Sequence, residues 1–325
     1  MSGDETSLGP ARRQGGRFLN PDGTPAGQPF SRVPRMLLDN RGGEPWPAHV
    51  ENAPYPFRAP GPGEVLVTYV GHATFLIRTA ELTLLTDPIW SDRASPLSWW
   101  GPKRVRAPGL AFDALPRVDV VLLSHAHYDH MDKRTLLALH HRDTPLILTG
   151  LLNDCTLAQW GIPGARGLDW GQSADLPRGG QATFLPARHF AARGPHDHSR
   201  TLWGGFAVAL PGGFRLCFLG DTAWGLHLAA IGAASGPFDV ALIPIGAYAP
   251  RWFMQAVHMI PEEAVQAHDA LRAHRSLAMH HAVFRLTSEP LDEPAARLRT
   301  ARGERDFGVP EVGETIRFAM PASCE

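Results

Sequence analysis

A largely apolar run, residues 118–123, leads directly into a segment that is rich in metal-binding side chains. The segment reads His125-Ala126-His127-Tyr128-Asp129-His130. Three imidazoles and a carboxylate this close together suit a divalent metal with nitrogen and oxygen ligands. Because the apolar run predicts a buried strand, the sequence places a metal site where a strand of a sheet ends. One loop cannot supply all the ligands of a hydrolytic metal centre, so the fold has to bring others to the same point.

The composition is that of an ordinary globular protein. With 325 residues, 44% of them hydrophobic, and a formal net charge of −1, the chain can bury a large core and lacks the basic balance of a nucleic-acid binder. We find no apolar segment long enough for a membrane span and no signal peptide, so we expect a cytoplasmic location. The cysteines, Cys155, Cys217 and Cys324, are too widely spaced to indicate a disulfide framework.

The hydrophobic patterns predict an α/β (α+β) fold. Residues 1–60 are rich in Gly, Pro and Arg and lack periodicity, so we expect an extended arm that wraps a domain formed by residues 61–325. Strands are predicted at 65–69, 74–78, 82–86, 118–123, 146–149, 182–186, 203–210, 214–219, 240–245 and 276–280. Helices are predicted at 133–140, 153–160, 226–231, 262–273 and 293–300. Hairpins followed by alternating strands and helices favour a four-layer αββα sandwich.

Further candidate ligands stand where later strands end. They are His189, then Asp221 in Gly220-Asp221-Thr222, then either His280 or His281. Strand ends at one edge of a sheet converge in space, so side chains from separate strands can meet there. His72 and Asp87 lie at the ends of earlier strand-like segments, and we expect them to orient a metal ligand.

In this order, the residues resemble those of the metallo-β-lactamase-fold hydrolases. Within that superfamily the chain is most similar to the phospholipase D group that hydrolyses N-acyl-phosphatidylethanolamine. The similarity rests on Val70-Gly71-His72-Ala73-Thr74, Leu85-Thr86-Asp87-Pro88, Pro250-Arg251-Trp252-Phe253-Met254 and Pro261-Glu262-Glu263-Ala264. It covers about residues 60 to 290 and implies an αββα sandwich of the metallo-β-lactamase type.

The resemblance also implies a pair of metal ions. One would be held by His125, His127 and His189, the other by Asp129, His130 and His280, with Asp221 bridging them. This chain has His280-His281 where the family has His-Trp, so His281 stays an alternative ligand. Two zinc ions are the expected cofactor; without a cysteine ligand, Fe²⁺ and Mn²⁺ remain alternatives.

The expected chemistry follows from such a pair. Metals bridged by Asp221 would lower the pKa of a shared water and generate hydroxide near neutral pH, which Asp129 could help to orient. By resemblance, Tyr128 and His258 contact the substrate phosphate. We therefore expect a phosphodiesterase that releases N-acylethanolamine and phosphatidic acid. Alternatives are a lactone or a small cyclic or sugar phosphate as the substrate, or a metal-stabilised scaffold without enzymatic activity.

The expected partners follow from that substrate. We expect a phospholipid or another small molecule, contact with the surface of the inner membrane and no nucleic acid; whether the chain forms a homodimer stays open. Core or rim packing is expected for any single one of the aromatic residues Trp99-Trp100, Trp203 and Trp252-Phe253. Together they are hypothesised to line a groove for acyl chains. The basic stretch Lys103-Arg104-Val105-Arg106 could contact anionic head groups.

Overall fold

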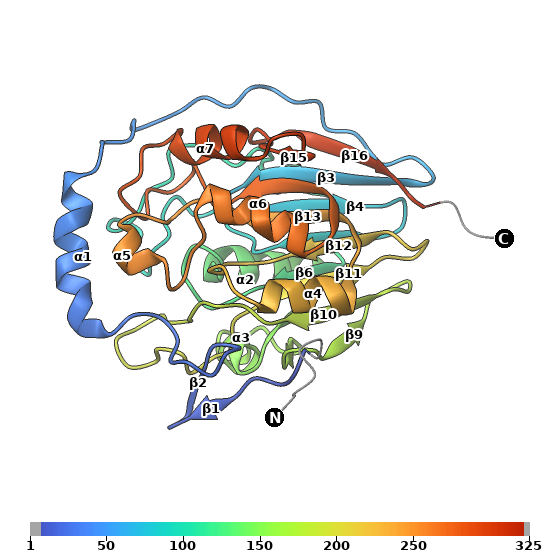
Figure 1. Ribbon diagram of the computed structural model, residues 1–325. Helices are drawn as coiled ribbons and strands as arrows, with labels where there is room; N and C mark the ends of the chain where they lie inside the picture. The colour runs from blue at the N-terminus through green and yellow to red at the C-terminus, as the bar shows by residue number, and fades with distance from the viewer. Residues whose placement is uncertain (1–7, 322–325) are drawn as a thin grey trace.

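The computed structural model describes residues 8–321, which form two seven-stranded sheets facing each other (Figure 1). The first runs in the order β16 (Thr315–Ala319), β3 (Glu64–Gly71), β4 (Thr74–Arg78), β5 (Thr83–Thr86), β6 (Val120–Leu123), β7 (Leu146–Gly150) and β8 (Arg166–Leu168). The second runs β15 (Phe307–Gly308), β14 (Ala273–Met279), β13 (Phe238–Pro244), β12 (Arg215–Phe218), β11 (Gly205–Ala209), β10 (Gln181–Leu185) and β9 (Ser173–Asp175). Each sheet is antiparallel at one side and parallel at the other.

Helices cover the outer faces of both sheets. On the first sheet, α3 (Asn153–Gln159) contacts β7 and β8, and α2 (Lys133–Asp143) contributes buried leucines to the core. On the second, α6 (Pro261–Ala270) contacts β13 and β14, flanked by α4 (His227–Ser235) and α7 (Glu293–Ala301). The predicted four-layer αββα sandwich is confirmed.

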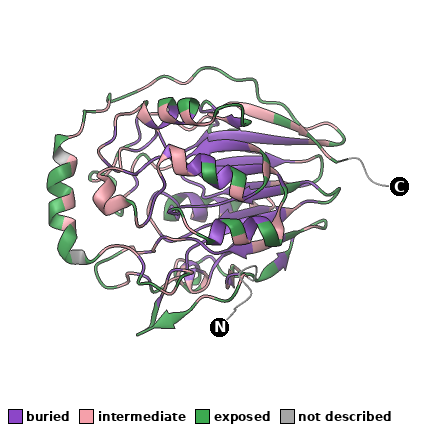
Figure 2. Ribbon diagram, in the orientation of Figure 1, coloured by how far each residue is buried: buried purple, intermediate pink, exposed green. Residues whose placement is uncertain are grey.

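The core is divided by the alternation of side chains along the strands. On β12, Leu216 and Phe218 face the first sheet, where Tyr69 of β3 belongs to the same core cluster, as does Phe184 of the neighbouring β10. Cys217, between them, faces the helix layer and packs with Ile231 of α4. Figure 2 shows the result: buried strands in the middle and helices with exposed outer surfaces.

The N-terminal arm contains short elements that the sequence did not predict. They are the hairpin β1 (Arg13–Gln14) and β2 (Arg17–Phe18), the 3-10 turns η1 (Phe30–Arg32) and η2 (Asn40–Gly42), and the helix α1 (Val33–Asp39). Among the described residues of the arm, α1 has no buried side chain, so it shows no core-facing stripe that a sequence pattern could reveal. In Figure 1, α1 lies beside α5 (Arg251–Met254), away from the sheets.

The histidine-rich segment forms the connection from β6 to α2. Its backbone turns back at His127, whose carbonyl accepts hydrogen bonds from the amides of His130 and Met131. Asp132 then caps α2 by accepting from the amide of Arg134. A third 3-10 turn, η3 (Phe112–Ala114), precedes β6. Within residues 8–321 no helix is both long and apolar enough to cross a membrane.

Candidate metal centre

Side chains from five strand ends meet at one edge of the two sheets. The histidine-rich segment follows β6, His189 follows β10, Asp221 follows β12 and His280 follows β14. His72 stands in the turn between β3 and β4, with φ of 58°. The convergence expected from the sequence is therefore present: all seven predicted metal ligands lie in one buried cluster.

One group within this cluster is formed by three imidazoles. His125 Nε2 lies 2.8 Å from His127 Nδ1, and His189 Nε2 lies 3.2 Å from the same atom. His189 donates its Nδ1 hydrogen to the carbonyl oxygen of Val257 at 2.9 Å, which leaves its Nε2 lone pair facing the group. This arrangement presents three nitrogen donors to one point.

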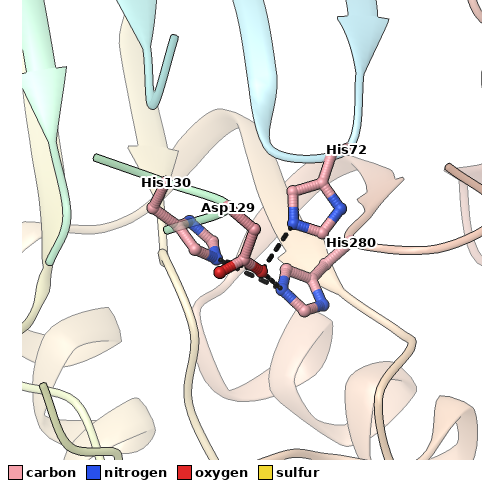
Figure 3. A group of neighbouring side chains, drawn as sticks. All are labelled: His72, Asp129, His130 and His280. Atoms are coloured by element: carbon pink, nitrogen blue, oxygen red, sulfur yellow. Dashed lines mark hydrogen bonds and ion pairs between the residues drawn. The ribbon is translucent and has the colours of Figure 1, made fainter. Parts of the chain in front are cut away.

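The second group is built around a carboxylate, and Figure 3 shows three imidazoles turned toward it. Asp129 Oδ2 lies 2.9 Å from His72 Nε2, 3.3 Å from His130 Nε2 and 3.3 Å from His280 Nε2. The hydrogen bond of His72 to Asp129 agrees with the expected orienting role, and its Nε2 also lies among the atoms that could hold a metal ion. The other three are the residues that the sequence assigned to the second metal.

Asp221 lies between the two groups. Its Oδ2 is 3.1 Å from His280 Nε2 and 3.2 Å from His130 Nε2 on one side. On the other side it is 3.7 Å from His189 Nε2 and 3.9 Å from His125 Nε2. Its Oδ1 is buried and has no hydrogen-bond partner among the described residues. One carboxylate oxygen therefore lies near nitrogen donors of both groups.

These donors fit divalent metal ions. Tetrahedral zinc with bonds of 2.0–2.1 Å to nitrogen sets its ligand atoms about 3.3 Å apart, close to the separations in both groups. Burial lowers the pKa of His127 to about 3 and that of His189 to about 4, so both are neutral and can ligate. Burial also opposes protonation of His130, yet the carboxylates of Asp221 and Asp129 outweigh it and raise the pKa of His130 well above its usual value. The same negative field favours a bound cation.

Asp87 orients one ligand from behind, as the sequence led us to expect. Its Oδ2 accepts the Nδ1 hydrogen of His130 at 2.6 Å, which fixes the Nε2 atom of that ring toward the cluster. Ser124 holds the carboxylate in place through its backbone amide, 2.7 Å from Oδ1, and through its hydroxyl. All three side chains are fully buried. Ser124 was not predicted, although it directly precedes the histidine-rich segment.

The two residues expected to contact substrate lie in different surroundings. His258 is buried, and its Nε2 is 3.9 Å from Asp221 Oδ2, at the edge of the ligand cluster. Tyr128 instead donates its hydroxyl hydrogen to the carbonyl of Arg193 at 2.7 Å, and the guanidinium of Arg193 covers its ring at 4.0 Å. His258 therefore stands beside the metal ligands, whereas the hydroxyl of Tyr128 is engaged at the rim.

Arg193 supports the histidine-rich segment and was missed in the sequence. Its guanidinium donates to the carbonyl of Ala126 at 2.8 Å and to that of Met131 at 2.9 Å. Ala126 lies between the ligands His125 and His127, and Met131 directly follows His130. Nothing in the local sequence signals this role, because Arg193 is brought to the segment from a distant loop.

The choice between His280 and His281 is decided by direction. The Nε2 atom of His280 faces both aspartates, and its backbone amide donates to the carbonyl of His72 at 2.8 Å. The ring of His281 instead stacks on Tyr69, with 6.4 Å between centroids. It lines a separate cavity of about 150 Å³, together with Arg106. His280 is thus the ligand candidate.

The proposed aromatic groove is wrong in part. Trp203 is fully buried and donates its indole hydrogen to the carbonyl of Ala187, so it belongs to the core. Trp252 is engaged by the carboxylate of Asp39, whereas Trp99 and Trp100 are 73% and 65% exposed.

The basic stretch is not a uniform charged surface either. Arg104 is buried, and it donates to the carbonyls of Ile89 and Ser91. It therefore stabilises a loop and cannot contact lipid head groups.

Comparison with known proteins places this centre in a family. The model of the β-lactamase superfamily domain matches residues 83–281. The chain belongs to the metallo-β-lactamase superfamily. It is 36% identical to the N-acyl-phosphatidylethanolamine-hydrolyzing phospholipase D 1 of Caenorhabditis elegans, over 74% of this chain and 71% of that protein. It is 30% identical to a metal-dependent hydrolase of Pyrobaculum calidifontis, over 78% of this chain and 99% of that one.

A solved structure agrees with the fold. The metallo hydrolase of the archaeon Ignicoccus hospitalis superposes with a TM-score of 0.59 at 25% identity, covering 78% of this chain and 98% of that one. Together with the cluster of histidines and aspartates, these similarities make this superfamily member a metal-dependent hydrolase.

Proposed function

We propose that the chain is a dinuclear phosphodiesterase that hydrolyses N-acyl-phosphatidylethanolamine to N-acylethanolamine and phosphatidic acid. The observation that carries the proposal is Asp221, one carboxylate within 3.1–3.9 Å of ligand nitrogens from both groups. Such a bridge brings two metals close enough to act on one phosphate. The similarity to the Caenorhabditis elegans phospholipase D supports this choice of substrate.

The ligand roles divide between the two groups. His125, His127 and His189 would hold one zinc ion; Asp129, His130 and His280, with His72 beside them, would hold the other, and Asp221 would bridge. When bound, such metals lower the pKa of a shared water and stabilise the negative charge that develops on phosphate oxygens.

His258 is the substrate-contacting side chain in this proposal. Burial lowers its pKa well below the usual value, so its ring is neutral and carries one N–H. Its Nδ1 is buried without a partner among the described residues, while Nε2 faces the cluster. A neutral imidazole in this position can donate one hydrogen bond to a phosphoryl oxygen without adding charge.

The proposed hydrolysis replaces one bond to phosphorus with another. Water adds its oxygen to phosphorus, and the bond between phosphorus and the ethanolamine oxygen breaks. The water oxygen stays on phosphatidic acid, and a proton from the water goes to the leaving N-acylethanolamine.

A phospholipid substrate also requires contact with a membrane surface, which we include in the proposal. Leu37 and Leu38 of α1 are 55% and 63% exposed, and Trp99 and Trp100 add two more exposed apolar side chains. Tryptophan and leucine are side chains that insert at a bilayer interface. Binding to phosphatidylcholine vesicles should weaken in the Leu37→Asp/Leu38→Asp double variant.

The test of the function is direct. Purified protein loaded with zinc is incubated with N-acyl-phosphatidylethanolamine in ¹⁸O-water, and the products are identified by mass spectrometry. We expect N-acylethanolamine and phosphatidic acid labelled with ¹⁸O, both abolished by Asp129→Asn. Asp119→Asn, which changes a half-buried carboxylate directly before β6 and outside the cluster, should keep the activity. Absence of turnover with zinc, iron or manganese would refute the proposed substrate.

A further inference from the structure

A large apolar pocket lies between the N-terminal arm and the edge of the metal centre. Its volume is about 760 Å³. The arm contributes Phe18, Ala26 and Val33, and the opposite wall contributes Phe190, Phe253 and Val257, among others. Among the described residues that line it, Arg17 is the only one with a permanent charge. A volume in this range is typical of sites that bury a small organic ligand.

The pocket directly adjoins the first group of metal ligands. The ring of Phe190 lies edge-on against that of His127, with 4.5 Å between centroids. The carbonyl oxygen of Val257 accepts a hydrogen bond from Nδ1 of His189, and Val257 directly precedes His258. Phe190 and Val257 thus line the pocket on one side and contact His127 and His189 on the other.

The arm is held firmly enough to serve as a wall. The backbone amide of Phe18 donates to the carbonyl of Ser199 at 2.8 Å, and the guanidinium of Arg17 reaches the carbonyl of His198. Gln28 donates its side-chain amide to the carbonyl of Phe253 at 3.0 Å. The family match begins at residue 83, so this wall is supplied by a part of the chain outside the matched domain.

We propose that this pocket binds one long acyl chain of the substrate, an inference that rests on the proposed function for the identity of the lipid. The chain enters from the metal centre and lies between Phe190 and the arm. Its source is either the N-acyl group or a glycerol ester, since both carry the same alkyl chemistry. The arm then acts as a selector of chain length: each buried methylene should tighten binding about fourfold.

A second pocket supplies a matched control. It lies between the arm and α4, has a volume of about 710 Å³ and is lined by Ala229. It also contains the ion pair of Arg188 with Asp22 at 2.9 Å, which makes it less suited to an alkyl chain.

The test measures acyl binding separately from catalysis. The probe is dansyl-undecanoic acid, whose fluorescence rises in apolar surroundings, and it is displaced by N-hexanoyl-, N-decanoyl- and N-tetradecanoylethanolamine. Ala192 lines the pocket on the wall of Phe190, opposite Ala26 of the arm. Ala26→Trp and Ala192→Trp fill the pocket from these two walls and should each weaken probe binding about tenfold or more. Ala229→Trp should leave it unchanged. Thermal unfolding of each variant shows whether it is folded.

The outcomes separate the two proposals. Unchanged probe binding in both filled variants, or loss only in Ala229→Trp, overturns the inference whatever the enzyme hydrolyses. If probe binding weakens in Ala26→Trp and Ala192→Trp but N-acyl-phosphatidylethanolamine is not hydrolysed, the proposed function is refuted and the acyl pocket is not. With turnover, shortening the acyl chain that occupies the pocket should raise KM in the unsubstituted protein and have little effect in Ala26→Trp. If shortening the N-acyl chain and shortening the glycerol ester chain each change KM equally in the unsubstituted protein and in Ala26→Trp, this pocket is not the acyl site.

Discussion

Replacing Asp87 by Asn tests whether a residue behind the ligands sets the metal affinity. The carboxylate accepts from His130 Nδ1 at 2.6 Å, from the Ser124 amide at 2.7 Å and from the Ser124 hydroxyl. An amide keeps one oxygen and turns an N–H toward a former donor, so one or two of these bonds are lost. If the oxygen faces Ser124, the His130 proton is displaced toward Nε2, the atom that faces the metals.

The Asp87→Asn variant should change both the free energy of unfolding and the affinity for metal. Hydrogen bonds to a charged group contribute about 1.5–3 kcal/mol each, so the unfolding free energy without metal should fall by about 2–5 kcal/mol. Loss of the partner that orients a ligand lowers metal affinity by about 10–100-fold. The first quantity is measured by urea unfolding in the presence of a chelator, and the second by competition with a chromogenic zinc chelator.

Asp119→Asn serves as the control for the Asp87 variant. Asp119 accepts from the amide of Thr83 at 2.9 Å in the same sheet, but it has no contact with a candidate ligand. We expect a loss of about 1 kcal/mol in stability and unchanged zinc affinity. Should Asp87→Asn lower stability and leave the zinc affinity equal to that of Asp119→Asn, the orienting role would be refuted.

Three further substitutions test the arrangement of the site. His280→Ala should reduce the metal content of the loaded protein from about two ions to one, as measured by mass spectrometry. His281→Ala should keep both ions because the ring of His281 faces another cavity. The opposite result would exchange the two assignments. In Arg193→Lys, the lysine cannot bond the carbonyls of both Ala126 and Met131 while it also covers the ring of Tyr128. The free energy of unfolding, measured in urea, should therefore fall by about 1–3 kcal/mol. An unchanged value would contradict the supporting role of Arg193.

The order of the ligands was accessible in the sequence because each one follows an apolar run. The runs before His125 and Asp221 predict β6 and β12, both of which the structure contains. A residue placed directly after a buried strand has little freedom in where it emerges, so local sequence alone places it at a sheet edge.

Long-range contacts were not accessible in the same way. The amide of Phe18 reaches Ser199, and the guanidinium of Arg193 reaches Ala126, across loops with no periodic pattern. Trp203 stands at the start of the predicted strand 203–210, and the local pattern there did not show that its ring is fully buried. Burial depends on what packs from the other sheet.

The sequence by itself determined the fold class and the candidate metal ligands through apolar periodicity and chemically distinctive side chains, and its motifs resemble those of the family to which the chain belongs. Only the tertiary structure decided that His280 rather than His281 faces the aspartates, that His72 joins the ligand group, and that the arm forms a pocket beside Phe190. Neighbouring residues such as His280 and His281 carry the same chemistry. The direction in which each ring points is set by backbone dihedrals and by packing between distant segments.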